Sequence, residues 1–324
     1  MLASLALAEL LLQVSGVAPP APAVSPYVDD EAVGNRLNSL GMREEWNELP
    51  AKEPGEVRVA FLGDSFTFGQ GVERYEAFPA VVGESLAASY PNRTIRVFNL
   101  GVMGDNTLEE SARYRDLHDE LEIDILVLVG YLNDFTSTNP AFTIGEIYGL
   151  DFEPGFTARN SLLAATVGRT VRNQIVRFLS SRHYSSSALA DIEGGEFEDF
   201  GDQIRSLRDF ATERDVEFKL AFFPWLFELD DYHLRPVHEN LALLAEAEEM
   251  EFLDLLEVYE GQDHEAMRAS AANEHPSALG HELAAEAFVG FLLPEVERIV
   301  ASDLEARLDS TSEARCYRSG SPRA

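Results

Sequence analysis

The sequence predicts a doubly wound α/β fold, in which helices cover both faces of a parallel sheet. Short apolar runs of strand length recur along the chain, at 57–63, 95–101, 124–130, 217–224 and 251–256. Segments with apolar residues at helical spacing follow them, at 78–90, 107–121, 197–214, 236–249 and 278–300. The second of these segments opens with Thr107 and Glu110, which indicate the capping box of a helix start. Strands that alternate with helices in this way form parallel sheets.

The first strand leads into the most informative stretch of the chain. Val57 and residues 59–62 form an apolar run, and Gly63, Asp64 and Ser65 end it. Open α/β sheets hold their ligands beyond the carboxyl ends of the strands, so a serine hydroxyl at this point is a candidate nucleophile. The alternative is that Asp64 and Ser65 only cap the next helix, since both are common N-cap residues.

Three later segments of the chain carry residues suited to acyl chemistry. Gly101 and Gly104 follow the second strand, and a glycine lets its backbone N–H approach a reacting group closely. Asn133 follows the third strand and offers a side-chain amide as a further donor to an oxyanion. His275 precedes the last helix, from where an imidazole can reach back to Ser65 as a general base.

The blocks around these residues resemble those of the SGNH (GDSL-like) hydrolases, in particular a bacterial esterase and acyl-hydrolase subgroup. GDSFTFGQGV is similar to the first block of that family, NLGVMGDNT to the second, GYLND to the third and EHPSALGH to the last. The four blocks stand in the family's order, and the resemblance extends over about residues 35–300.

This resemblance implies a role for each residue. It makes Ser65 the nucleophile, with its own backbone N–H as one oxyanion donor. It makes Gly104, in preference to Gly101, the second donor, Asn133 the third donor and His275 the base. It also implies a three-layer α/β/α flavodoxin-like sheet, and ester or acyl chemistry without a metal or an organic cofactor.

One position departs from the family pattern. The family places an aspartate three residues before its catalytic histidine, and Ala272 occupies that position here. The groups left to hold the imidazole are Asn273, Glu274, a more distant carboxylate such as Asp263, or a backbone carbonyl. Loss of the orienting carboxylate from a triad costs about 10⁴-fold in rate. An active dyad and a degraded enzyme are therefore both open at this point.

The predicted function is hydrolysis of carboxylic esters of small molecules or carbohydrates through an acyl-serine intermediate. Two alternatives stay open: acetyl transfer to a polysaccharide hydroxyl, and a non-catalytic carbohydrate- or acyl-binding protein that has lost its triad aspartate. An α/β-hydrolase is disfavoured, because Thr67 stands where the nucleophile elbow of that fold has glycine. No phosphate-binding glycine loop follows a strand.

The charge balance excludes some partners. The chain carries 57 Asp and Glu residues against 25 Lys and Arg, a formal net charge of −32. Such a surface repels nucleic acids and anionic lipid headgroups. We also hypothesise adaptation to high salt, because screening weakens the self-repulsion of dense carboxylates. The single cysteine, Cys316, excludes an internal disulfide.

Residues 27–300 form one predicted domain, which an N-terminal segment (1–26) precedes and a C-terminal tail (301–324) follows. Residues 1–26 combine an apolar segment with a stiff Pro-rich linker. The apolar segment includes Glu9, lacks a basic start and is short for a membrane span. We expect it to serve export or membrane anchoring, with an amphipathic helix packed on a cytoplasmic protein as the alternative. Residues 301–324 are expected to be a disordered tail.

The alternation of strands and helices is interrupted from about 135 to 195. This insertion contains a helical stretch at 161–182 and follows the carboxyl end of a predicted strand. Because that position lies over the candidate site, we expect a lid that sets substrate specificity. A helix that only packs on the body is the alternative.

Overall fold

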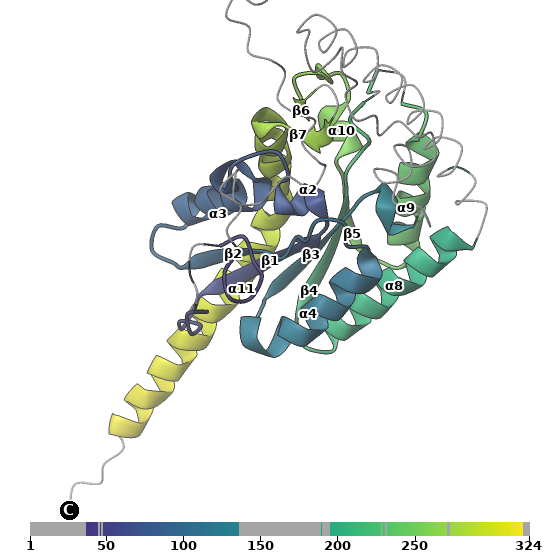
Figure 1. The fold of residues 1–324 in the computed structure, drawn as a ribbon. Coiled ribbons are helices and arrows are strands. Elements are labelled where there is room, and N and C mark those ends of the chain that lie inside the picture. The colour runs from purple at the N-terminus through teal and green to yellow at the C-terminus, as the bar shows by residue number, and fades with distance from the viewer. Residues whose placement is uncertain are drawn as a thin grey trace, which may run out of the picture.

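The computed structural model describes residues 37–135 and 195–319, except 45, 47, 228, 231, 271 and 272, together with residue 189. Side chains are described as far as residue 305. Within these ranges the chain forms a five-stranded parallel sheet with helices on both faces (Figure 1). The predicted α/β fold class is confirmed.

The five strands follow the predicted apolar runs closely. They are β1 (Val57–Gly63), β2 (Ile95–Asn99), β3 (Ile125–Gly130), β4 (Glu217–Phe222) and β5 (Glu251–Asp254). Their order in the sheet is β2-β1-β3-β4-β5, and every neighbouring pair is parallel. β1 and β3 are buried along their whole length because they lie inside the sheet and are covered on both faces. The carboxyl ends of the five strands therefore share one edge.

Helices pack on the two faces as expected of right-handed crossovers. One face carries α3 (Phe78–Ser89) and α11 (Ala278–Ser319). There the Phe61 ring of β1 contacts Phe78 and Phe288, with ring centroids 5.1 and 4.9 Å away. The other face carries α4 (Thr107–Leu121), α8 (Glu196–Thr212) and α9 (Arg235–Ala247), with Tyr114 of α4 against Phe210 of α8 (Figure 1). The three-layer α/β/α arrangement is confirmed.

Short elements gather at the carboxyl edge of the sheet. They are α2 (Ser65–Phe68), η2 (Arg74–Glu76), η3 (Leu132–Asp134), α10 (Leu256–Tyr259) and an antiparallel hairpin of β6 (Arg268–Ser270) with β7 (Asn273–Pro276). Figure 1 shows α2, α10 and the hairpin at the same end of the sheet. The sequence did not predict them, because elements of three or four residues are too short to show a period.

The start of α4 differs by one residue from the prediction. Asn106, rather than Thr107, is the N-cap, and its side chain accepts hydrogen bonds from two backbone N–H groups of the first turn. Glu109 completes the capping box. Thr107 and Glu110 are buried instead, and the Thr107 hydroxyl donates to Asp134 Oδ1 over 2.7 Å. Asn and Thr are both good N-caps, so the sequence does not separate them.

Of the two predicted ends of the chain, the structure describes only part of the C-terminal one. Residues 1–26 and nearly all of 135–195 lie outside the described residues, so the expected anchor and lid are not described here. α11 continues to Ser319, past residue 301, where the sequence predicts a disordered tail. Residues 303–315 are rich in Glu, Ala, Leu and Arg, which favour a helix. No helix in the described part of the chain is long and apolar enough to cross a membrane.

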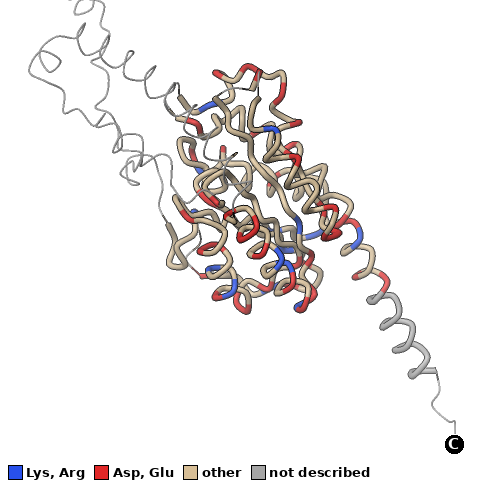
Figure 2. Tube along the Cα trace, turned by 90° about the vertical axis from the view of Figure 1, so that its right-hand side faces the viewer, with Lys and Arg blue, Asp and Glu red and all other residues tan. Residues whose placement is uncertain are grey.

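Acidic residues are spread around the described body (Figure 2). Basic residues lie among them, and several are in ion pairs, such as Arg205 and Arg208 with Glu248. The excess negative charge is therefore distributed over the surface, and its self-repulsion acts on the whole domain.

Candidate active site

Ser65 stands on a sharp turn between β1 and α2. The Asp64 carboxylate caps the helix by accepting a hydrogen bond from the Phe66 N–H over 2.8 Å. Phe66, Thr67 and Phe68 are buried, whereas Ser65 is only half-buried. The turn thus anchors its apolar residues in the core and leaves the serine hydroxyl accessible at the sheet edge. The two predicted roles of this stretch coexist, with Asp64 as the cap and Ser65 as the candidate nucleophile.

Arg43 holds the far end of this turn. Its side chain is 1% exposed, and its guanidinium donates to the carbonyls of Phe68 (3.0 Å), Gly69 (2.8 Å) and Val72 (2.6 Å). The last carbonyls of a helix have no intrahelical partner, so a buried donor is needed there. Nothing in the sequence marks this arginine except its place in the polar segment before the first strand.

His275 lies in β7 and faces the serine. Its Nε2 is 2.6 Å from Ser65 Oγ, within reach of direct proton transfer. The Phe66 ring packs against the imidazole, with centroids 4.8 Å apart. Burial lowers the pKa of His275 to about 3, so the ring is neutral at physiological pH. A neutral imidazole with a free Nε2 lone pair is the form that a general base requires.

Asn273 contacts the other side of the imidazole. Its Oδ1 is 2.5 Å from His275 Nδ1 and also accepts the His275 backbone N–H over 3.0 Å. Asp263, one of the alternatives that the sequence left open, binds the Glu265 N–H instead. Ala272 lies outside the described residues. Of the side chains named as candidates, Asn273 is the one in contact with the ring.

Glu274 points to the opposite side of β7, as alternation along a strand requires. Its carboxylate accepts a hydrogen bond from Trp225 Nε1 over 3.1 Å, and burial raises its pKa to about 7.

Trp225 is itself held by a buried chain of hydrogen bonds. Its backbone N–H donates to the Tyr232 hydroxyl (2.9 Å), which contacts His238 Nε2 (3.0 Å), and His238 Nδ1 contacts Asp254 (2.7 Å). Through Glu274, this network supports the face of β7 opposite His275. The sequence did not reveal the network.

The predicted oxyanion donors lie in neighbouring loops. The Asn133 amide donates to the Asp105 carbonyl over 3.0 Å, which ties the loop after β3 to the loop after β2. It also lies close enough to the Asp64 carboxyl to lower the pKa of that group. Gly104 precedes Asp105, is exposed and has a left-handed φ of 85°. The structure thus brings Ser65 and His275 into direct contact, and it places Asn133 beside the residue that precedes Ser65.

Gly101 has a packing role at the same place. A Cβ on this residue would lie 2.3 Å from the Phe68 nitrogen and 2.7 Å from the Thr67 carbonyl carbon. The loop after β2 therefore touches the backbone of α2 directly, and only glycine permits that approach. A Cβ on Gly104, by contrast, would meet nothing within 4 Å. The two glycines of this loop therefore differ in packing, since Gly101 is held against α2 and Gly104 is in open space.

Three buried carboxyl groups lie beneath these loops: Asp64, Glu110 and Asp134, which we call the carboxyl cluster. Asp134 accepts from Thr107 and from the Tyr131 N–H, each over 2.7 Å. Neither oxygen of Glu110 has a hydrogen-bond partner among the described residues. Burial raises the pKa of Asp64 to about 8 and of Asp134 to about 6, and it raises that of Glu110 well above its usual range.

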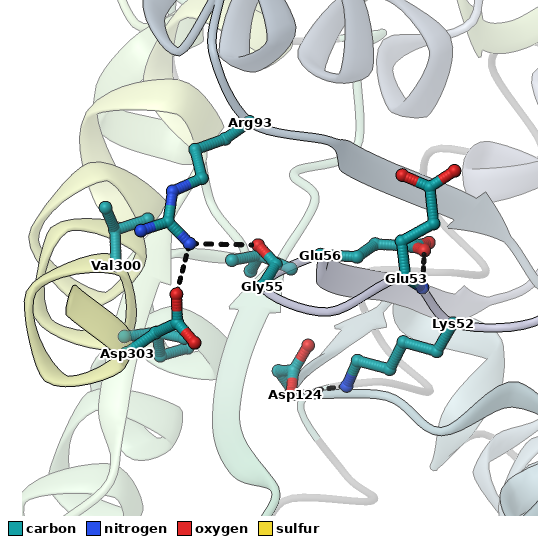
Figure 3. Close-up of a pocket in the computed structure, with 10 residues that line it drawn as sticks. Lys52, Glu53, Gly55, Glu56, Arg93, Asp124, Val300 and Asp303 are labelled. Atoms are coloured by element: carbon teal, nitrogen blue, oxygen red, sulfur yellow. Dashed lines mark hydrogen bonds and ion pairs between the residues drawn. The ribbon is translucent and has the colours of Figure 1, made fainter. Parts of the chain in front are cut away.

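A cavity of about 200 Å³ lies at the opposite, amino edge of the sheet (Figure 3). Its two described cations are both paired, Lys52 with Asp124 over 2.7 Å and Arg93 with Asp303 and the Gly55 carbonyl. Because the cavity lies at the edge of the sheet opposite Ser65, it is separate from the Ser65 site. Among the residues with described positions, no group of three His, Cys, Asp or Glu side chains is arranged to hold a metal ion.

The sequence matches a known family over most of the domain. A model of the GDSL-like lipase/acylhydrolase family matches residues 61–283, more than half of the chain. The chain belongs to this family. The resemblance read from its sequence blocks is confirmed, and membership supports an ester hydrolase as its general class.

Solved structures with similarity to this GDSL-like chain include two hydrolases. One is LAE5, an alpha/beta hydrolase enzyme from the metagenome of Lake Arreo, Spain, which is 18% identical to this chain. The match covers 72% of this chain and 94% of LAE5, with a TM-score of 0.45. A catalytic mutant of Axe2, an acetylxylan esterase from Geobacillus stearothermophilus, is 16% identical, with coverages of 75% and 94% and a TM-score of 0.45. A comparison with curated proteins gives no match.

The two glycines of the second family block should respond differently to substitution. Gly101→Ala is expected to destabilise the domain by about 1–3 kcal/mol through overpacking and to lower esterase turnover, because its Cβ displaces the Ser65 turn. Gly104→Ala is expected to cost about 1–2 kcal/mol through its backbone angle only. Thermal unfolding and turnover of both variants test this. Equal turnover in the two variants would contradict the packing role of Gly101.

The Glu110→Gln variant should become more stable than wild type as the pH rises. A carboxyl whose pKa is raised by folding contributes stability below its unfolded pKa, and that contribution is lost as the pH rises towards its folded pKa. Glu110→Gln removes this titration, so the variant should melt increasingly above wild type between pH 5 and 8. A gain of about 1 kcal/mol would raise the melting temperature by roughly 2–4 °C.

The matched control is Glu120→Gln, an exposed position on the same helix. Its melting temperature should follow that of wild type at every pH. Parallel curves for Glu110→Gln and wild type would show that Glu110 holds no extra proton in the folded state.

Proposed function

We propose that this chain is a serine hydrolase that cleaves carboxylic esters through an acyl-serine intermediate. The observation that carries the proposal is the 2.6 Å contact between His275 Nε2 and Ser65 Oγ. This contact lies at the carboxyl edge of a parallel sheet, where α/β folds hold their ligands. It joins two residues 210 positions apart in a chain of the GDSL-like family.

The first half-reaction acylates the serine. Ser65 Oγ attacks the ester carbonyl carbon while its proton passes to His275 Nε2. The tetrahedral intermediate then collapses, the bond to the leaving oxygen breaks, and His275 returns the proton to the departing alcohol. In the second half-reaction, His275 takes a proton from water, the hydroxide attacks the acyl carbon, and Ser65 Oγ leaves with that proton as the carboxylic acid is released.

The oxyanion donors are the N–H groups of Ser65 and Gly104 and the amide of Asn133. Ser65 is the first residue of α2, so its N–H has no intrahelical acceptor. A side-chain amide carries two donor hydrogens, and those of Asn133 face the Asp105 carbonyl and the Asp64 carboxyl, so one of them must turn to the oxyanion when it forms. Its link to Asp105 also orients the amide before the substrate binds.

Neutral esters are the favoured substrates. A net charge of −32 repels anionic substrates, and it favours release of the carboxylate product. We therefore propose small neutral esters, including acetylated sugars, as the substrate class. Transfer of the acyl group to a sugar hydroxyl, in place of water, would appear as a product that depends on the added acceptor.

An activated serine should react with a fluorophosphonate probe. We expect wild type to be labelled, and Ser65→Ala and His275→Ala to lose labelling, because the first lacks the nucleophile and the second the base. Ser89→Ala, which removes an exposed hydroxyl at the end of α3, is the control and should label as wild type does. A folded wild type that stays unlabelled in low and in molar salt would favour the binding-protein alternative.

The Asn133 amide should matter to turnover more than to substrate binding. Loss of one oxyanion donor costs about 10²–10³ in turnover, so Asn133→Ala is expected to lower kcat by that factor on a p-nitrophenyl ester with little change in KM. The Asn240→Ala variant, on the exposed side of α9, is the control for the loss of an amide. Near-normal kcat in Asn133→Ala would remove this residue from the mechanism.

A further inference from the structure

We infer that Asn273 is the third member of the site and that its side-chain oxygen orients His275 where the family has a carboxylate. The inference rests on the proposed function, in which His275 is the base. It makes Asn273 a positioning residue, which acts on the reaction through the imidazole and does not touch the substrate.

The orientation of the Asn273 amide is fixed by two donors from one residue. Oδ1 accepts the His275 backbone N–H over 3.0 Å and faces His275 Nδ1 at 2.5 Å. A backbone N–H can only donate, so the group that faces it must be the amide oxygen rather than the NH₂. The same oxygen then accepts the hydrogen of Nδ1, which leaves the lone pair of Nε2 directed at Ser65.

This arrangement avoids the usual defect of an amide in a triad. When asparagine replaces the aspartate of a serine-protease triad, the imidazole takes the wrong tautomer and the rate falls by about 10⁴. Here the His275 backbone N–H would meet the amide NH₂ if the side chain turned over, so two donors would oppose each other. Asn273 therefore supports the productive tautomer without carrying a charge.

The strand places Asn273 where it can do this. Residues two apart in a strand point to the same side, so Asn273 and His275 share one face of β7 and Glu274 takes the other. Pairing of Asn273 with Ser270 in β6 fixes the strand, and the Trp225 indole holds Glu274 away from the ring. The family's aspartate stands one position earlier, so the orienting role has moved by one residue along the chain.

A neutral partner has a chemical consequence. It holds the ring but adds no negative charge to stabilise the imidazolium. In the described part of the chain, the titratable groups near His275 are Asp64, which is 3.5 Å from Ser65 Oγ, Glu274 on the opposite face of β7, and His281 of α11. A carboxylate at position 273 would be a new charge directly on Nδ1. It would favour the protonated ring and raise the pKa of His275.

The test compares Asn273→Asp and Asn273→Ala with wild type. The aspartate variant keeps an acceptor for the backbone N–H, so a purely structural role predicts an unchanged pH profile. We expect instead that the acid limb of kcat/KM for p-nitrophenyl acetate moves up by about 1–3 pH units, with activity retained at pH 8. Asn273→Ala should lower kcat by about 10²–10⁴ with little change in KM. Asn240→Ala is the matched control.

A second measurement does not depend on turnover. ¹⁵N NMR of the His275 ring should show a neutral imidazole with its proton on Nδ1 in wild type, and a mixture of tautomers in Asn273→Ala. An unchanged pH profile in Asn273→Asp, or a wild-type tautomer in Asn273→Ala, would overturn the role of Asn273.

The two proposals fail in different ways. Absence of fluorophosphonate labelling in wild type would overturn the proposed function, whatever the tautomer of His275. Labelling of Asn273→Ala at the wild-type rate would leave the function standing and overturn only the inference about Asn273.

Discussion

The geometry of the site depends on the hydrogen bonds that the guanidinium of Arg43 donates. It is buried beneath the short helix that begins at Ser65 and donates to three backbone carbonyls of that turn. A four-residue helix cannot satisfy its own last carbonyls, and buried acceptors without a donor are costly. Asp64 holds the start of this short helix and Arg43 holds its end, so the backbone that carries Ser65 is tied down on both sides. His275 can then be placed against Ser65 by a separate part of the chain.

The groups that meet around Ser65 carry little charge, although the chain as a whole is strongly acidic. His275 is neutral, Asn273 is an amide, and burial raises the pKa of Asp64 to about 8. Asp and Glu residues are spread around the rest of the described body, and many of them are exposed (Figure 2). In the proposed mechanism, an oxyanion at Ser65 would therefore meet N–H dipoles rather than repulsion from a nearby like charge, and such preoriented dipoles are an effective source of catalysis.

The sheet and the Ser65–His275 contact were predictable, because long apolar runs define strands and the family blocks identify both residues. The position of Asn273 was not. Its role depends on residues 273–276 forming a strand, and that strand is too short and too polar to be predicted. The burial of Glu110 was equally hidden, since its helix is polar overall and its neighbour Glu109 is exposed. Pattern reveals an element's type, whereas these two roles arise from tertiary contacts.

The buried chain from Trp225 to Asp254 ends on β5, an outer strand of the sheet, and Gly101 follows β2, the other outer strand. Neither of these outer strands precedes Ser65 or contains His275. Yet β5 supports the back of the histidine hairpin, and the loop after β2 presses on the serine turn. The turn that carries Ser65 and the hairpin that carries His275 are thus each contacted from a different outer strand of the sheet, so a change near either outer strand can reach the distance between Ser65 Oγ and His275 Nε2.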